Sequence, residues 1–420
     1  MKKILSVVLI LALALSLVAC TTANTDLYDA SKNMQEVKAI ETNTDISFNL
    51  SGQGLGTVET TELKQVAMVV NSMKLNIKDK SIENEEGTSA RAESEINIDF
   101  MGMNIPLKGW SEIDLDKSEM VMISKLPEIF LGLIGTPIES DGDNPLEGKE
   151  YIVNDISSMM KAEGQDLDLE EMLEFQKEFQ PKLIKFMEEI EKDLKLDTRI
   201  IKVEEEGEID GEKVKVYRLK LNDESLREVV KGTVNYVLEN KTSREFVLEY
   251  MDEYIDTMKK MSMQDELSQS DLKELEERLD DFESDLDGNL DKLKRDFNLF
   301  MDKYKDIRIL GEEGINILYS VNRDGYVVEK DGIIDLRIDL AQLAQFKEEK
   351  NQEESMFSDT EMKGIVNLKI TFKSNNTNIN NEELTVEWPE LTRENSLNMD
   401  ELMEIQMQMI EELEDMPIEE

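Results

Sequence analysis

Alternation of apolar and polar residues, repeated in many short runs, constrains the fold of this chain more than any other feature. In residues 94–110, SEINIDFMGMNIPLKGW, the apolar residues first occupy even positions, as at Ile96 and Phe100. After Gly102 they occupy odd positions, as at Ile105. Because successive side chains of a strand point to opposite faces, this switch predicts a hairpin turn or a bulge centred on Gly102. We therefore expect two neighbouring antiparallel strands here.

Similar runs recur along the chain and predict further strands. They are TDISFNLSG (44–52), MKLNIKD (73–79), VKVYRLKL (214–221), INILYSV (315–321), IDLRIDL (334–340), IVNLKITF (365–372) and LTVEW (384–388). Asp-Gly pairs at 210–211, 324–325 and 331–332 predict tight turns, because these residues tolerate positive φ. Alternation with a polar opposite face indicates sheets buried on one side, as antiparallel sheets often are. No repeated βαβ pattern supports a doubly wound, two-lobed solute-binding protein.

Helical periodicity marks the remaining segments. Apolar residues at spacings of three and four predict helices in 26–40, 62–70, 168–194, 224–240, 243–261 and a C-terminal segment from 397. In residues 271–304 this spacing approaches a heptad repeat, with one irregularity near Gly288. We interpret it as a pair of helices packed on their own domain. A coiled coil that binds a partner is the alternative.

The chain opens with a secretory pattern that ends at its single cysteine. Lys2 and Lys3 precede an uncharged run, residues 4–19, which is shorter than the roughly 20 apolar residues of a membrane span. The run ends in LSLVAC, and the polar TTANTD follows Cys20 directly. A buried cysteine within a signal anchor is the alternative interpretation. The position of the only thiol favours covalent attachment.

The residues LVAC resemble the lipobox of bacterial lipoproteins. In that family the thiol receives a diacylglyceryl group, and cleavage makes the lipidated cysteine the new N-terminus. The resemblance implies lipidation of Cys20, with palmitate as an acyl group, and attachment to the outer, extracytoplasmic face of the cell membrane. Two chains hold a protein there stably, whereas one holds it only marginally, since each buried CH₂ contributes about 0.8 kcal/mol.

Composition restricts the chemistry. The chain has 94 acidic and 48 basic residues, a formal charge of −46, and loses two further positive charges if Lys2 and Lys3 are removed. Nucleic-acid binding is excluded because it needs clustered Lys and Arg. The absence of histidine removes Ser-His-Asp and Cys-His catalysis and imidazole metal sites. We expect no enzyme and no cofactor. A hydrolase using two close, buried acids with opposed pKa values remains an alternative.

Two kinds of motif resemble metal sites, but packing or turns explain them better. MKKMSM (258–263) and MQM (407–409) contain soft ligands for Cu(I), yet their helical spacing favours a core or groove lining. That spacing includes Met399, Met403 and Met407. DGDN (141–144) and DLDGNLD (285–291) lack the complete twelve-residue calcium loop. We assign no metal ligand.

The order of elements carries a second resemblance. The helix YDASKNMQEVKAIET (28–42), the hairpin EIDGEKVKVYRLKL (208–221) and the segment GYVVEKDGIIDLRIDL (325–340) resemble Firmicute, especially clostridial, lipoproteins over most of 28–400. They resemble LolA- and LppX-type lipoprotein carriers more distantly. In those carriers a curved antiparallel sheet forms a half-barrel, with helices on its concave face around a lipid-sized cavity. This chain departs from them in its long helical segment, 222–304, and it lacks the copper-amine-oxidase-like module that some relatives carry.

These patterns give an expected organisation of six segments. They are a signal peptide (1–19), a lipidated tether (20–26), a β-rich part with helices (27–221), a helical segment (222–304), antiparallel strands that complete the sheet (305–395), and a C-terminal helix with an acidic tail (396–420). We expect an α+β body that binds or carries an apolar or amphiphilic ligand, such as a lipid, beside the membrane. The alternative is a non-enzymatic envelope scaffold or accessory protein that binds an envelope protein through its helical segment.

Overall fold

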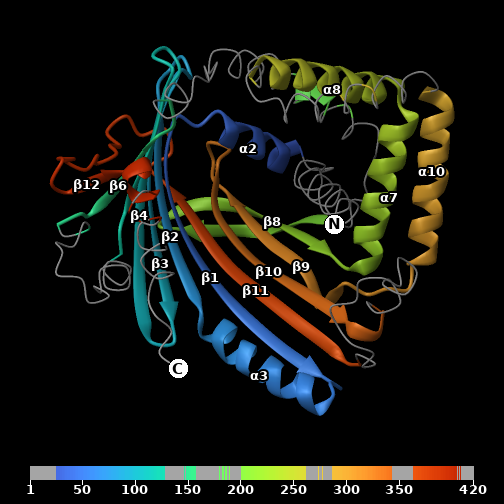
Figure 1. Ribbon diagram of the computed structural model, residues 1–420. Helices are drawn as coiled ribbons and strands as arrows, with labels where there is room; N and C mark the ends of the chain where they lie inside the picture. The colour runs from blue at the N-terminus through green and yellow to red at the C-terminus, as the bar shows by residue number, and fades with distance from the viewer. Residues whose placement is uncertain are drawn as a thin grey trace. The chain divides into compact units, whose positions relative to one another are not determined.

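A computed structural model of the chain describes residues 25–127, 148–157, 200–261, 286–342 and 363–403 (Figure 1). It also describes residues 146, 179, 182, 183, 185, 186, 189, 273, 277, 405 and 407. The elements, in chain order, are α2 (Thr25–Gln35), β1 (Ala39–Gln53), α3 (Thr57–Ser72), β2 (Lys74–Glu83), β3 (Ser89–Phe100), β4 (Met103–Asp114), β5 (Glu119–Lys125), β6 (Tyr151–Asp155), β7 (Ile201–Ile209), β8 (Glu212–Leu221), α7 (Asp223–Glu239), α8 (Lys241–Met261), α10 (Leu286–Lys303), β9 (Leu310–Val321), β10 (Val327–Asp339), β11 (Ile365–Thr377) and β12 (Ser396–Asn398).

The strands form a large open sheet, so the protein belongs to the expected α+β class. Its twelve strands follow the order β12-β6-β5-β4-β3-β2-β1-β11-β10-β9-β8-β7. The hairpins β3–β4, β7–β8 and β9–β10 are antiparallel, as is the β10–β11 pair. The short strand β12 is an exception, because it pairs with β6 in parallel. Alternation in the sequence therefore identified the main strands correctly.

The chain divides into two compact units, each built from separated segments. Unit 1 comprises residues 1–37, 45–74 and 171–376, and unit 2 comprises residues 38–44, 75–170 and 377–420. Unit 1 contains α2, α3, α7, α8, α10 and strands β7 to β11. Unit 2 contains β3 to β6, β12 and most of β2.

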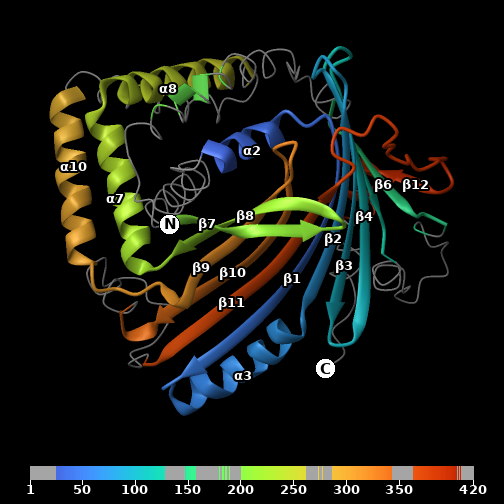
Figure 2. The same ribbon diagram turned by 180° about the vertical axis from the view of Figure 1, so that it is seen from behind.

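In unit 1, the first turns of α7 pack against β8 and β9, and α10 runs beside α7 (Figures 1 and 2). The main core joins Leu219 and Leu221 of β8 to Leu226 and Val229 of α7, all of which are buried. Phe297 of α10 packs against the edge of this core. The face of the sheet that carries Leu219 and Leu221 is called the inner face below.

Helix α2 packs on the same inner face in a second cluster. Its Leu27 and Ala30 contact Tyr217 of β8, whose side chain is completely buried. Val321 and Val327 complete the cluster at the turn between β9 and β10. The helix expected over residues 26–40 therefore exists but ends at Gln35, because the chain turns there into β1.

The contact between α7 and α10 accounts for part of the heptad-like pattern. Leu290 is buried, and Asn235 and Asn298 exchange two amide hydrogen bonds of 3.3 and 3.0 Å across the helix pair. For the described part of the pattern, 286–303, packing within the chain is therefore confirmed. Leu293 and Phe300 remain 48 % and 38 % exposed, because only one flank of α10 meets α7. Most of 262–285 lies outside the described residues.

The turn expected at Asp331–Gly332 is wrong. Both residues lie in the middle of β10, where Gly332 pairs with Ile317 of β9 and Phe372 of β11. A Cβ atom on Gly332 would collide with the Phe372 ring. Glycine is therefore present for close side-chain approach within a strand and not for a turn. The Gly102 hairpin and the Asp210–Gly211 turn are confirmed, since the flanking residues pair directly across them.

The strand expected at 384–388 is also wrong, because these residues join no ladder in unit 2. Side chains replace strand partners there: the Trp110 indole N–H donates to the carbonyl of Glu387 at 2.7 Å. The backbone N–H of Glu387 donates to the Glu93 carboxylate at 3.3 Å. The alternating residues therefore lie outside the sheet, and side chains form hydrogen bonds with the backbone of Glu387 in place of a neighbouring strand.

The methionine stripe of the C-terminal segment belongs only partly to a core. Met399 packs against the cluster of Leu397 and Leu402 in unit 2, whereas Met403 and Met407 are 42 % and 58 % exposed. A four-residue step in an α-helix advances about 40° beyond a full turn, so the stripe rotates away from the core. Met403 and Met407 therefore do not belong to this core, and a groove lining stays a prediction for them. The side chains of Met258 and Met261 lie outside the described set.

Candidate functional site

The register of the strands shows that the inner face of unit 1 continues as an apolar surface onto β10 and β11. Leu221 pairs with Ile315, Ile315 pairs with Ile334, and Ile334 pairs with Ile370. Residues directly opposite each other in antiparallel strands share a face of the sheet. The row that begins beneath α7 therefore extends across four strands to β11.

On β11 this apolar surface lies outside the core that packs beneath α7. Four apolar side chains of β11 on the inner face are half-buried: Val366, Leu368, Ile370 and Phe372. None of them belongs to the core clusters of the described residues, whereas Ile334 and Leu336 of β10 pack at the edge of the main cluster. We call Leu336, Val366, Leu368, Ile370 and Phe372 the apolar strip.

One charged residue occupies the inner face beside the apolar strip. Lys330 pairs with Tyr319 of β9 and with Ser374 of β11, two residues before Gly332. Its side chain is half-buried, and burial lowers its pKa below the usual value of 10.5 because the charged form loses hydration. Within the described residues Lys330 forms no hydrogen bond and no ion pair.

The lysines on the opposite face of β11 behave differently. Lys369 forms an ion pair with Glu313 at 2.5 Å, and Lys373 forms one with Glu329 at 2.8 Å. Hydrogen bonding to these carboxylates raises the pKa of both lysines. Each of these lysines is therefore stabilised as a cation by an acid, whereas Lys330 is a desolvated cation with no such acid in the described part of the chain.

Lys330→Met is expected to stabilise the protein at pH 7 by about 1 kcal/mol, because it removes a charge that folding desolvates. The lowered pKa means that the unfolded chain holds this proton more tightly than the folded one. The unfavourable contribution of Lys330 to wild-type stability should therefore fall as the pH rises towards 10.5 and Lys330 loses its proton, so the advantage of the variant should shrink. Urea denaturation followed by far-UV circular dichroism at pH 7 and pH 10.5 measures both effects.

The control for this prediction is Lys373→Met, which removes a paired and half-exposed lysine from the neighbouring strand. Its effect should be a loss of stability of about 0–1 kcal/mol. A destabilised Lys330→Met, or an advantage that does not depend on pH, would show that the ammonium group has a favourable partner.

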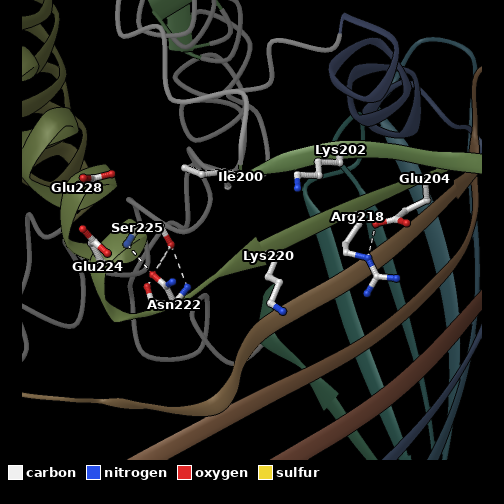
Figure 3. A pocket seen from close by; sticks show the side chains of 9 residues that line it. All are labelled: Ile200, Lys202, Glu204, Arg218, Lys220, Asn222, Glu224, Ser225 and Glu228. Carbon is white, nitrogen blue, oxygen red and sulfur yellow. Dashed lines mark hydrogen bonds and ion pairs between the residues drawn. The ribbon is translucent and has the colours of Figure 1, made fainter.

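Three pockets in unit 1 are lined mainly by residues with charged or polar side chains. The pocket in Figure 3, about 320 Å³, lies between β7, β8 and the start of α7. Lys202 and Lys220 project from the strands on one side, and Glu224 and Glu228 project from the helix on the other. Arg218 is paired with Glu204 at 2.6 Å. A second pocket, about 540 Å³, includes residues of the β9–β10 turn and of α2.

The largest of these pockets, about 740 Å³, lies beside the irregular start of β9. Buried Asp335 accepts a hydrogen bond from the backbone N–H of Glu313 at 3.1 Å. Arg337 reaches Asp339 only at 3.9 Å, and its Nε atom is buried without a hydrogen-bond partner. Charges of both signs line the pocket, so its chemistry suits a small polar ligand and not a hydrocarbon chain.

Only some of the site residues that the sequence suggested lie within the described part of the chain. Cys20 and the DGDN motif lie outside the described residues. The DLDGNLD motif enters the first turn of α10 at Leu286, in agreement with its interpretation as a helix face. The buried carboxylates of the described residues, Asp114 and Asp335, belong to different units and have partners of their own. No group of three or more His, Cys, Asp or Glu side chains in the described part could hold a metal ion.

Sequence reasoning did not identify Lys330. The signal was available, because Lys330 shares its even parity with the apolar residues Ile334 and Leu336. A charged residue at a core-facing position of a strand is unusual and indicates a special environment.

Among the described residues, no helix has the length and hydrophobicity needed to cross a membrane. The chain matches no known protein family, and no curated protein matches it.

Proposed function

We propose that this protein is a lipid-anchored extracytoplasmic protein that binds an amphiphilic ligand, such as a lipid, on the inner face of unit 1. In this proposal the thiol of Cys20 carries the anchor, and the sheet forms a LolA-like half-barrel with helices on its concave face. The protein is not an enzyme in this proposal. The ligand contacts the apolar strip, and the polar pockets on unit 1 play no part in holding its hydrocarbon chain.

The observation that carries the proposal is the half-buried apolar strip. Helices α7 and α10 bury the same face over β8 and β9, but Leu368 and Ile370 of β11 lie outside that core. Apolar side chains that share a face and remain partly accessible gain about 25 cal/mol for each Å² that a ligand removes from water. A hydrocarbon chain is the simplest ligand that could cover such a strip.

The short tether supports a location close to the bilayer. Helix α2 begins at Thr25, so five residue steps separate it from Cys20. Fully extended, they span at most about 18 Å. A ligand held in unit 1 would therefore remain near the membrane from which it came.

The proposal predicts that Ile370→Gln weakens binding of a neutral amphiphile about tenfold, because a polar group replaces an aliphatic one on the apolar strip. The probe is a photoactivatable fatty alcohol added to membranes that contain the full-length protein. Crosslinking to the protein is measured at several probe concentrations, since all variants then compete with the same bilayer.

The matched control is Ile333→Gln, because Ile333 is also half-buried but points to the opposite face of β10. It should crosslink like the wild type. Crosslinking that is absent from the wild type, or equal reduction by both variants, would refute binding on the inner face.

The exposed side of α10 favours a second candidate function, an envelope scaffold. Leu299 and Phe300 of this helix are 67 % and 38 % exposed. Leu293, which precedes them on the same helix, is 48 % exposed. Apolar residues of this size on an exposed helix can bind a partner helix. Replacing Leu293 and Leu299 by Glu in the full-length chain should abolish partner capture in a scaffold and leave amphiphile crosslinking unchanged in a carrier.

A further inference from the structure

We propose that Lys330 binds the anionic head group of a single-chain amphiphile, with one negative charge as in a fatty acid, whose hydrocarbon chain lies along the apolar strip. This inference rests on the proposed function and names the class of ligand. It assigns a role to the one cation that the inner face of β10 and β11 carries.

The first argument is the position of Lys330 relative to the apolar strip. Across the sheet, Lys330 belongs to a row with Tyr217, Tyr319 and Ser374, which all carry hydroxyl groups. The next rows, in the direction of Ile338, are apolar: Phe372 faces Gly332, and Ile370 faces Ile334. The inner face is thus polar at Lys330 and apolar on one side of it, which is the pattern of a head group and its chain.

The length of the apolar rows fits a single acyl chain. Six residue steps separate Gly332 from Ile338, which corresponds to about 20 Å of strand. One leaflet of a bilayer is about 15 Å of hydrocarbon, which is the length that one lipid chain occupies. A chain that begins at Lys330 can therefore lie entirely on the strip.

The charge favours a monoanion. The other basic residues of β10 and β11 are Arg337, Lys369 and Lys373, and their parity places them on the opposite face. Lys330 is half-buried and has no acid beside it within the described residues, so an anionic ligand would supply its missing partner. A head group with two charges would leave one of them unpaired beside an apolar surface, which is unfavourable.

The test compares two photoactivatable probes of equal chain length, a fatty acid and a fatty alcohol, in isolated membranes that contain the full-length protein. Isolated membranes prevent metabolic transfer of the fatty acid to the lipid anchor. In the wild type both probes should crosslink. Lys330→Met should reduce fatty-acid crosslinking about tenfold or more, because a charge-assisted hydrogen bond is lost, and should leave alcohol crosslinking unchanged.

Two further variants complete the design. Lys330→Arg keeps the positive charge and should retain most of the fatty-acid crosslinking. Lys373→Met removes a lysine from the opposite face and should match the wild type with both probes. A thermal melt of each variant confirms that it is folded.

The outcomes separate this inference from the proposed function. If Lys330→Met crosslinks the fatty acid like the wild type, or loses both probes equally, the head-group role is refuted while ligand binding stands. If the wild type crosslinks neither probe, the proposed function itself fails.

Discussion

Cys20→Ala is expected to abolish incorporation of labelled palmitate and to release the protein body from membranes. The reason is that Cys20 carries the only thiol of the chain, and in the proposed function this thiol holds the diacylglyceryl group. Each CH₂ of the anchor contributes about 0.8 kcal/mol of binding, so loss of two chains removes the whole hydrophobic attachment. The strongly acidic body would not replace it, since an anionic bilayer surface repels a chain with net charge −46.

Palmitate labelling and membrane pelleting after a high-salt wash measure this effect. Thr21→Ala is the matched control, because it changes the adjacent residue and keeps the thiol. It should retain both the label and the membrane fraction. Undiminished labelling of Cys20→Ala, or a variant that still pellets fully, would refute the anchor. The uncharged run 4–19 could not replace the lipid anchor well as a membrane span, since a span needs about 20 apolar residues.

The strands of this protein could be predicted because their side chains obey a period of two. Alternation placed β3, β4, β8, β9, β10 and β11 in the sequence, and the parity switch at Gly102 located the β3–β4 hairpin. These are local signals, since each depends only on which face of one strand is buried. The spatial order, in which β1 stands beside β11, depends on contacts between distant segments and has no local signal.

The incorrect predictions arose where a distant side chain determined the local structure. Gly332 looks like a turn residue in the sequence. It is a glycine because the Phe372 ring from β11 occupies the space that a side chain at this position would need. Residues 384–388 alternate like a strand, but Trp110 and Glu93 take the backbone hydrogen bonds that a neighbouring strand would make. In both cases tertiary contacts decide between structures that the local sequence permits equally.

The error at Gly332 also concealed the candidate site. A turn at 331–332 would end the strand there and make Lys330 an ordinary loop lysine. With β10 continuous, Lys330 falls on the same face as Ile334 and Leu336, and it becomes a cation beside an apolar strip. The functional interpretation of this residue therefore depends on the continuity of one strand.

The two faces of β10 and β11 have different chemistry, and this difference limits where a hydrocarbon chain can bind. The opposite face carries paired charges such as Lys369 with Glu313, and it contributes to a polar pocket. The inner face carries the apolar strip and Lys330, which has no ionic partner among the residues that the structure describes. Because a strand alternates strictly, one sheet can present both surfaces without any change of backbone.

Gly314→Ala is expected to destabilise unit 1 by about 3 kcal/mol, the largest stability effect that we predict for a single methyl group. Gly314 has a φ of +64°, and a Cβ atom there would collide with the carbonyl oxygen of Leu221. The residue lies in the irregular stretch of β9 where Leu310 pairs with Leu336 and Ile315 pairs with Ile334. Strain from the positive φ and overpacking against backbone therefore act together, immediately beside the main core.

Gly211→Ala separates these two causes. Gly211 also has a positive φ, +85°, but a Cβ atom there would meet nothing within 4 Å. This control should lose only about 1 kcal/mol, from backbone strain. Urea denaturation followed by far-UV circular dichroism measures both variants, because Trp110 and Trp388 lie in unit 2 and their fluorescence does not report directly on unit 1. Equal losses would mean that the Leu221 carbonyl moves aside at little cost, and the bulge of β9 would then be a pliable feature beside the inner face.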